Sequence, residues 1–231
     1  VMCLGLDATL EGEEGDAGNI YASADKNDLN LPGLQQELLE EVYKTGKPVI
    51  LVLASGSALA VNWADEHVPA IIEAWYAGAE GGSAVASLIF GGFSPTGKLP
   101  VTFYRTTEEL PEFIDYSMKN RTYRYMENKA LYPFGYGLSY TKFKYTNLIK
   151  SKDEIKSGET CQFKITVKNI GQCESEETVQ LYLKDVEASV IIPKYELKGI
   201  KKINLEPGQE GILEFELTRS EERRVGKECM E

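Results

Sequence analysis

Five carboxylates stand within ten residues near the start of the chain, in a glycine-rich segment that reads "GLDATLEGEEGDAGN". They are Asp7, Glu11, Glu13, Glu14 and Asp16. Negative charges this close raise one another's pKa, so one of these groups can keep its proton where an ordinary carboxyl has lost it. A carboxylic acid of that kind suits general-acid catalysis. The segment is therefore a candidate for acid catalysis, a cation site or a solvated acidic turn.

Glycoside hydrolysis is the reaction that carboxylate pairs perform most directly. One carboxylic acid protonates the leaving oxygen, and a second carboxylate acts from the opposite side of the sugar. The acidic segment could supply the first of these groups. Composition by itself favours the solvated turn.

A calcium loop is the second use that the acidic segment suggests. An EF-hand loop needs oxygen ligands at its first, third and fifth positions, glycine at the sixth and glutamate at the twelfth. Asp7, Thr9, Glu11 and Gly12 fit the opening, but Gly18 stands at the twelfth position. Without the bidentate glutamate we expect no metal site.

Two other site patterns fail on inspection. "GFSPTGKL" nearly spells a phosphate-binding loop, but Leu99 replaces the magnesium-binding hydroxyl and Pro100 obstructs the helix that should follow. A serine triad needs a histidine base, and the single histidine, His67, lies far from any nucleophile elbow. We expect a structural role for His67 and no nucleotide cofactor.

Charge and composition exclude further classes. The 231 residues carry a net charge of −11, so no basic stripe is available for nucleic acid. No apolar run approaches the roughly 18 residues of a membrane span. We therefore expect neither a nucleic-acid nor a membrane partner.

The four cysteines show no metal-ligand spacing. Cys3 lies in an apolar run and is expected to be a buried, inert thiol. A disulfide between Cys161 and Cys173 is a minor alternative. Nothing in the cysteine usage requires an oxidising compartment.

The first half of the chain alternates between strand and helix patterns. "VMCLGLD" and "PVILVLA" are continuous apolar runs, typical of strands buried on both faces. "VPAIIEAWYAG" predicts a third strand. Between the first two, apolar residues at helical spacing predict a helix that begins at Pro32, with Asn30 as a possible cap, and "AEGGSAVASLIFGG" predicts another helix. This alternation predicts a parallel sheet covered by helices, whose ligands bind at the carboxyl ends of the strands.

The second half begins after a connection rich in Pro, Gly and aromatic residues. Short alternating segments then predict an antiparallel β-sandwich, namely "KFKYTNL", "CQFKITVKNIG", "TVQLYLKDV" and "GILEFELT". Only four or five strands are visible, so we expect this domain to be incomplete. We place the domains at 1–104 (α/β), 105–140 (connection) and 141–219 (β-sandwich).

Several motifs, in order, resemble the C-terminal half of glycoside hydrolase family 3, which includes β-glucosidases and β-xylosidases. They are "VMCLGLDATLEGEEGD", "LNLPGLQQELLEEV", "PVILVLASGSALAVNWA", "AIIEAWYAGAEGGSAVASLIFGGFSPTGKLPVTF" and "YPFGYGLSYTKF". The resemblance implies an α/β sandwich domain followed by a fibronectin type III-like domain. It also implies a retaining mechanism, with the aspartate nucleophile on an upstream TIM barrel and the acid/base glutamate on a loop of the α/β domain.

The family's loop pattern, roughly E-x-E-x-x-D-R, aligns with Glu11, Glu13 and Asp16, so the resemblance assigns the general acid/base to Glu13. Glu11 and Glu14 are the alternatives, because a run of glutamates leaves the register open by one or two residues. Ala17 stands where many members have arginine.

We expect the chain to be a fragment that supplies half of an active site and hydrolyses nothing alone. Its expected partners are a terminal β-linked glucoside or xyloside, as substrate, and the missing barrel of the same polypeptide. No cofactor is implied, and residues 220–231 are expected to be foreign to the family. A non-catalytic sugar-binding or scaffolding module of the same fold is the alternative.

Other residues could line the site. Tyr123 and Arg124 of "RTYRYM" could order its edge, although packing is the commoner role. Trp63 and Trp75 could offer aromatic faces to sugar, but tryptophan beside a helix or strand is more often part of the core.

Overall fold

The computed structural model describes residues 1–7, 10, 26–156, 158–187 and 191–218. These form two compact units that alternate along the chain. Unit 1 comprises Val1–Phe90 and Pro100–Phe134, and unit 2 comprises Gly91–Leu99 and Gly135–Glu231. The domain boundaries expected from the sequence remain a prediction.

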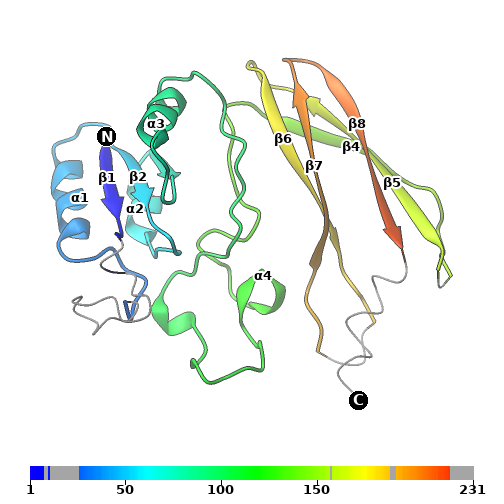
Figure 1. The fold of residues 1–231 in the computed structure, drawn as a ribbon, viewed down its shortest axis with the longest axis horizontal. Helices are drawn as coiled ribbons and strands as arrows, with labels where there is room; N and C mark the ends of the chain where they lie inside the picture. Colours follow the sequence, from blue (N-terminus) through cyan, green and yellow to red (C-terminus); the bar gives the residue numbers. More distant parts are fainter. Residues whose placement is uncertain (8–9, 11–25, 157, 188–190, 219–231) are drawn as a thin grey trace. The chain divides into compact units, whose positions relative to one another are not determined.

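Unit 1 is built on three parallel strands in the order β1-β2-β3 (Figure 1). β1 is Met2–Gly5, β2 is Ile50–Ala54 and β3 is Ala70–Glu73. Leu53 of β2 is in register with Leu4 on one side and with Glu73 on the other. The predicted parallel sheet is confirmed, and all three strands end at the same edge.

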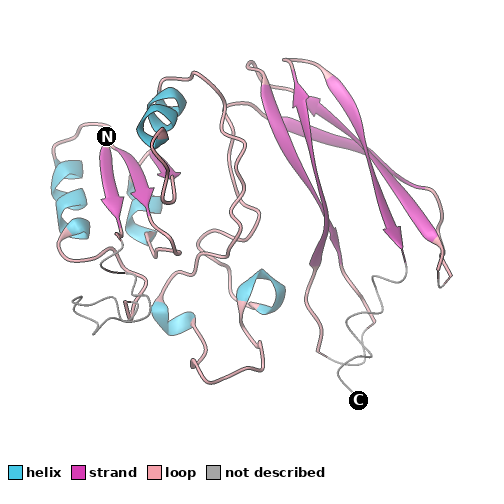
Figure 2. Cartoon of the chain, viewed as in Figure 1, coloured by secondary structure: helices cyan, strands magenta, loops and turns pink. Residues whose placement is uncertain are grey.

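Three helices accompany the sheet, as Figure 2 shows: α1 (Gln35–Lys44), α2 (Asn62–His67) and α3 (Gly81–Ile89). The predicted start of α1 at Pro32, with Asn30 as its cap, is wrong. Gly33 adopts a φ of +57°, which a right-handed helix cannot contain, so the helix begins after that turn.

The core of unit 1 forms around β2 and the residues that flank it. Leu51, Val52 and Leu53 of β2 are buried, and Leu39 of α1 is fully buried. The prediction for β1 was wrong in part: Cys3 is exposed, and β1 lies at an edge of the three-stranded sheet, where it pairs with β2 alone.

The stretch from Pro100 to Phe134 completes unit 1 with little regular structure, as its lack of periodicity predicts. It contains η1 (Thr107–Glu109) and the short helix α4 (Thr122–Tyr125). A single β-bridge joins Phe103 to Tyr132, and Phe103 is almost fully buried.

Unit 2 consists of antiparallel strands, which confirms the predicted all-β fold. β4 (Phe143–Lys150), β5 (Thr160–Asn169) and β8 (Glu210–Thr218) form one sheet, and β6 (Ser175–Leu183) pairs with β7 (Glu196–Leu205) in another. The core of this unit consists of Val167, Val179, Leu205 and Phe215.

β7 is the strand that the sequence did not single out. Gly199 interrupts its apolar pattern, and glycine is depleted in strands. The structure explains this glycine, because a Cβ at Gly199 would lie 2.8 Å from the Phe215 ring. The register also shifts here, since Leu181 pairs with Gly199 and Tyr182 with Leu197, and the extra residue that this leaves in β7 further disturbs the alternation.

The described cysteines are free thiols. Cys161 is buried and Cys173 is partly buried, so the disulfide considered between them is absent. Among the described residues, no helix combines the length and the apolar character that crossing a bilayer requires.

Candidate active site

The end of β1, from which the acidic segment departs, is fixed from two sides. Gly5 N–H donates to Gln35 Oε1 at 2.8 Å, and Gln35 Nε2 donates to Gly5 O at 2.9 Å. The next amide, Leu6 N–H, donates to Ala54 O of β2 at 2.7 Å. The first turn of α1 and the end of β2 therefore hold the chain where it leaves the sheet.

Glycine is required at this point for two reasons. Gly5 has a φ of +137°, and a Cβ there would lie 2.0 Å from Ala54 O. Side-chain-bearing residues rarely adopt this φ, and the close approach of the two strands leaves no room for a methyl group.

The chain is fixed again where it returns from the acidic segment. Leu29 N–H donates to Thr107 Oγ1 at 3.1 Å, and Leu29 O accepts from Ala60 N–H at 2.7 Å. The Lys26 ammonium donates to Asn30 O at 2.7 Å and to Asp28 Oδ1 at 3.1 Å.

Asp28 is ionised in this arrangement. Burial disfavours its charge, but the Asn30 N–H and the Lys26 ammonium outweigh that effect and hold the pKa of Asp28 below its ordinary value. The ion pair between Lys26 and Asp28 thus lies where the chain rejoins unit 1 after the acidic segment.

The predicted acid/base, Glu13, its alternatives Glu11 and Glu14, and the neighbouring Asp16 and Ala17 lie outside the described residues. Their assignment remains a prediction. What the structure adds is the position of the two flanking points, Gly5 and Leu29.

A second polar group lies at the same edge of the sheet. Glu73 ends β3, and its Oε1 accepts hydrogen bonds from Trp75 N–H at 3.0 Å and from Ser55 Oγ at 3.3 Å. Its Oε2 is buried and has no hydrogen-bond partner among the residues that the structure describes. Burial raises the pKa of Glu73 to about 7, against the weaker opposing effect of the two hydrogen bonds. No sequence signal marks this group, because a glutamate at the end of a strand is expected to be solvated.

In the segment that resembles a phosphate-binding loop, "GFSPTGKL", the lysine makes structural contacts. Lys98 Nζ donates to Gly137 O at 2.8 Å and lies 3.9 Å from Glu177 Oε2. The Lys98 side chain is 17% exposed. Two groups of unit 2 therefore engage its charge.

His67 and Trp63 also have structural partners. His67 stacks on Trp63 with a centroid distance of 4.4 Å, and its Nδ1 is 2.8 Å from Trp63 O. Tyr43 meets both rings edge-on. The structural role expected for His67 fits this geometry.

Tyr123 of the "RTYRYM" motif is a packing residue in this structure. Its ring stacks on Phe134 at 4.4 Å, and its N–H donates to Thr102 Oγ1 at 3.0 Å.

Among the residues that the structure describes, no group of three or more His, Cys, Asp or Glu side chains could hold a metal ion.

Comparison with known proteins agrees with this architecture. The glycosyl hydrolase family 3 C-terminal domain matches residues 1–140, and a fibronectin type III-like domain matches residues 177–229. Both expected domains are therefore confirmed by type.

The chain is similar to longer proteins with glycosidase names. It is 40% identical to a xylan 1,4-β-xylosidase from Xylanibacter ruminicola over 95% of this chain and 25% of that protein. It is 36% identical to a periplasmic β-glucosidase from Salmonella typhimurium over 86% of this chain and 28% of that protein. The chain thus spans about a quarter of the length of these relatives.

Solved structures show the same relationship. A β-glucosidase from Erythrobacter marinus superposes with a TM-score of 0.82 at 38% identity, covering 94% of this chain and 29% of that one. A family 3 β-glucosidase from Bifidobacterium adolescentis also gives 0.82, at 32% identity, covering 95% and 33%. The chain belongs to glycoside hydrolase family 3, of which it carries the C-terminal α/β domain and the fibronectin type III-like domain.

Proposed function

We propose that this chain is the acid/base-bearing part of a retaining exo-β-glycosidase and that Glu13 is the general acid/base. Glu11 and Glu14 are the alternatives for that role. The nucleophilic carboxylate belongs to an upstream barrel that this chain does not contain.

One observation carries the proposal: the acidic segment leaves the carboxyl end of a parallel strand whose last residue is held in place. Gln35 binds both backbone groups of Gly5, and Leu6 is tied to Ala54. Ligands of open α/β sheets bind at this edge. A carboxyl group that must come within hydrogen-bond distance of a sugar oxygen needs a backbone that is held in place in this way.

The chemistry assigned to Glu13 has two steps. It first protonates the glycosidic oxygen while the nucleophile attacks the anomeric carbon and the leaving group departs. It then takes a proton from the water that hydrolyses the glycosyl-enzyme, which returns Glu13 to its acid form and frees the nucleophile. Neither step calls on a metal or organic cofactor.

The substrate class follows from the relatives. Those described above are named β-xylosidase and β-glucosidase. We infer that the complete enzyme removes terminal β-linked xylose or glucose, and that the isolated chain, without a nucleophile, turns over neither.

A chimaera tests the proposal. The corresponding C-terminal region of the Xylanibacter relative is replaced by this chain, and aryl β-xylosides and aryl β-glucosides are assayed. We expect hydrolysis by the chimaera, a loss of about a hundredfold or more in Glu13→Gln, and a much smaller loss in the matched control Glu14→Gln. Azide should partly restore Glu13→Ala, because it attacks the glycosyl-enzyme without a general base.

Two results would contradict the proposal. If the chimaera is active and Glu13→Gln does not affect its activity, another residue must be the general acid/base. A folded chimaera that binds sugar but hydrolyses neither substrate favours the non-catalytic module of the same fold.

A further inference from the structure

The turn that follows β3 contains two costly features within three residues. Trp75 has a φ of +53°, in the left-handed region that bulky residues avoid. Two positions earlier, the buried Glu73 Oε2 lacks a hydrogen-bond partner within the described part of the chain. Both features are unfavourable, so the contacts around this turn must hold it in place.

The contacts around the turn show how it is held. Glu73 Oε1 receives the Trp75 N–H at 3.0 Å and the Ser55 hydroxyl at 3.3 Å. Ser55 is itself fully buried at the end of β2. The Trp75 ring packs edge-on against Phe103 at a centroid distance of 6.1 Å, and Phe103 is 1% exposed.

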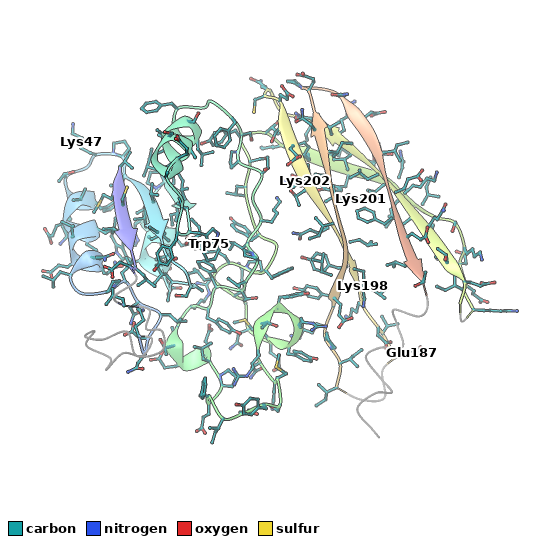
Figure 3. The ribbon with its side chains drawn as sticks, viewed as in Figure 1. Lys47, Trp75, Glu187, Lys198, Lys201 and Lys202 are labelled. Atoms are coloured by element: carbon teal, nitrogen blue, oxygen red, sulfur yellow. The ribbon has the colours of Figure 1, made fainter. Side chains whose placement is uncertain are left out.

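The indole is nevertheless not enclosed. Trp75, which Figure 3 labels, is partly exposed and follows the end of β3 by two residues. The turn is at the carboxyl edge of the sheet, the edge from which the acidic segment also departs. β1 and β3 are separated by one strand, hence by about 10 Å between their axes. That distance is comparable to one or two sugar rings.

From this arrangement we propose that Trp75 is a sugar-stacking residue for the β-linked substrate, held in its strained conformation by Glu73 and Ser55 as positioning residues. The exposed part of the indole takes the apolar C–H face of a pyranose ring. This inference rests on the proposed function, because it places the sugar at the edge where Glu13 is proposed to act.

The second tryptophan provides a contrast. Trp63 belongs to α2, is covered by the stacked His67 ring and is met edge-on by Tyr43. Backbone strain is absent at Trp63. It therefore serves as the matched control for Trp75, and these are the two tryptophans of the chain.

The test is a titration of this chain with xylobiose and with cellobiose, followed by tryptophan fluorescence. Trp63→Phe leaves Trp75 as the single reporter, and Trp75→Phe leaves Trp63. We expect a saturable spectral shift in Trp63→Phe and its loss in Trp75→Phe. Loss of the indole stack should weaken binding about five- to tenfold when binding is followed by a fluorescence-independent method such as calorimetry.

The positioning role has its own readout. Glu73→Gln keeps an acceptor oxygen for Trp75 N–H and Ser55 Oγ, so it should bind sugar like the native chain. Glu73→Ala removes the acceptor and should weaken binding about tenfold while circular dichroism shows a folded chain. A folded Glu73→Gln that loses binding, or a Glu73→Ala that keeps it, overturns the positioning role.

Failure of this inference differs from failure of the proposed function. A folded Trp63→Phe chain without a sugar-dependent shift, or equal binding by Trp75→Phe, overturns the stacking role and leaves the assignment of Glu13 intact. Conversely, a chimaera whose hydrolysis is unaffected by Glu13→Gln contradicts the assignment of Glu13, an outcome that the binding assay of Trp75 does not report.

Discussion

The side-chain amide of Gln35 pairs with both backbone polar groups of Gly5, thirty residues away in the sequence. One bond is donated by the glycine and the other by the glutamine, so Gln35 acts like a strand partner on the side of β1 opposite to β2. This pairing fixes the direction in which the chain leaves the sheet.

Replacing Gln35 by Glu should weaken that anchor. A carboxylate can still accept from Gly5 N–H, but it turns a second oxygen towards Gly5 O, to which nothing is then donated. We expect a loss of about 1–3 kcal/mol in the free energy of unfolding of unit 1. Urea unfolding followed by tryptophan fluorescence measures it, because Trp63 and Trp75 are both in unit 1.

Gln36→Glu is the matched control for this experiment. Gln36 Nε2 donates to Glu40 Oε1 at 2.8 Å along the surface of α1. Losing that bond and gaining a like charge one turn away should cost only about 0.5 kcal/mol. Equal effects of the two substitutions would show that the Gln35 anchor has no special weight.

Gly5→Ala should destabilise unit 1 by more than about 3 kcal/mol, because the added methyl would lie 2.0 Å from Ala54 O. Gly46→Ala is the control: its φ is +74°, yet nothing lies within 4 Å of the added Cβ. It should cost about 1 kcal/mol, from backbone strain alone. The same urea unfolding curve separates the two, and a Gly5→Ala chain as stable as Gly46→Ala would contradict the close approach of the strands.

Glu73 should make unit 1 less stable as the pH rises. Its pKa is raised from an ordinary 4.5 to about 7 in the folded chain, so between these values the folded state binds more protons than the unfolded state. The free energy of unfolding therefore falls across this window and levels off above it.

Glu73→Gln isolates this effect, since glutamine does not titrate. The difference in unfolding free energy between the native chain and Glu73→Gln, measured from about pH 4 to about pH 8, should grow in favour of the variant as the pH rises. A difference that is flat across this range, or that changes in the opposite direction, would show that Glu73 is not buried in its neutral form.

Asn169 should be the most sensitive polar position of unit 2. It is fully buried, and its Nδ2 donates to Cys173 O at 2.8 Å and to Leu205 O at 2.9 Å. Its Oδ1 accepts from Thr141 Oγ1 at 2.6 Å and from Gly171 N–H at 3.0 Å.

Asn169→Asp turns an oxygen towards two carbonyls in place of the amide group and should cost about 3 kcal/mol or more at neutral pH. Asn204→Asp, at an exposed residue of β7, should cost about 0.5 kcal/mol. Thermal unfolding followed by circular dichroism of the β-sheet measures both. Similar melting temperatures for the two variants would contradict the role given to Asn169.

Local patterns in the sequence predict most of the fold. The apolar runs of β1, β2 and β3 and the glycine after α1 are short-range signals, and each appears in the structure where the pattern predicts it. The pattern was misleading at three places. The turn at Gly33 makes α1 begin later than predicted, and Cys3 of β1 is exposed. Gly199 interrupts the apolar pattern by which β7 would have been recognised.

The candidate site divides in the same way. The acidic segment with Glu13 is visible in the sequence as a crowd of carboxylates, and the order of surrounding motifs gives its family. The unusual state of Glu73 has no sequence signal, because it depends on the burial that Ser55 and the turn at Trp75 create around it.

The sequence by itself determined that an α/β unit precedes an antiparallel β unit and that an acidic segment leaves the first strand, because these follow from residue periodicity and composition. Only the tertiary structure decided how that exit is held. Gln35 meets Gly5, and Ser55 meets Glu73, through contacts between residues far apart in the chain, and such contacts exist only once the elements have packed.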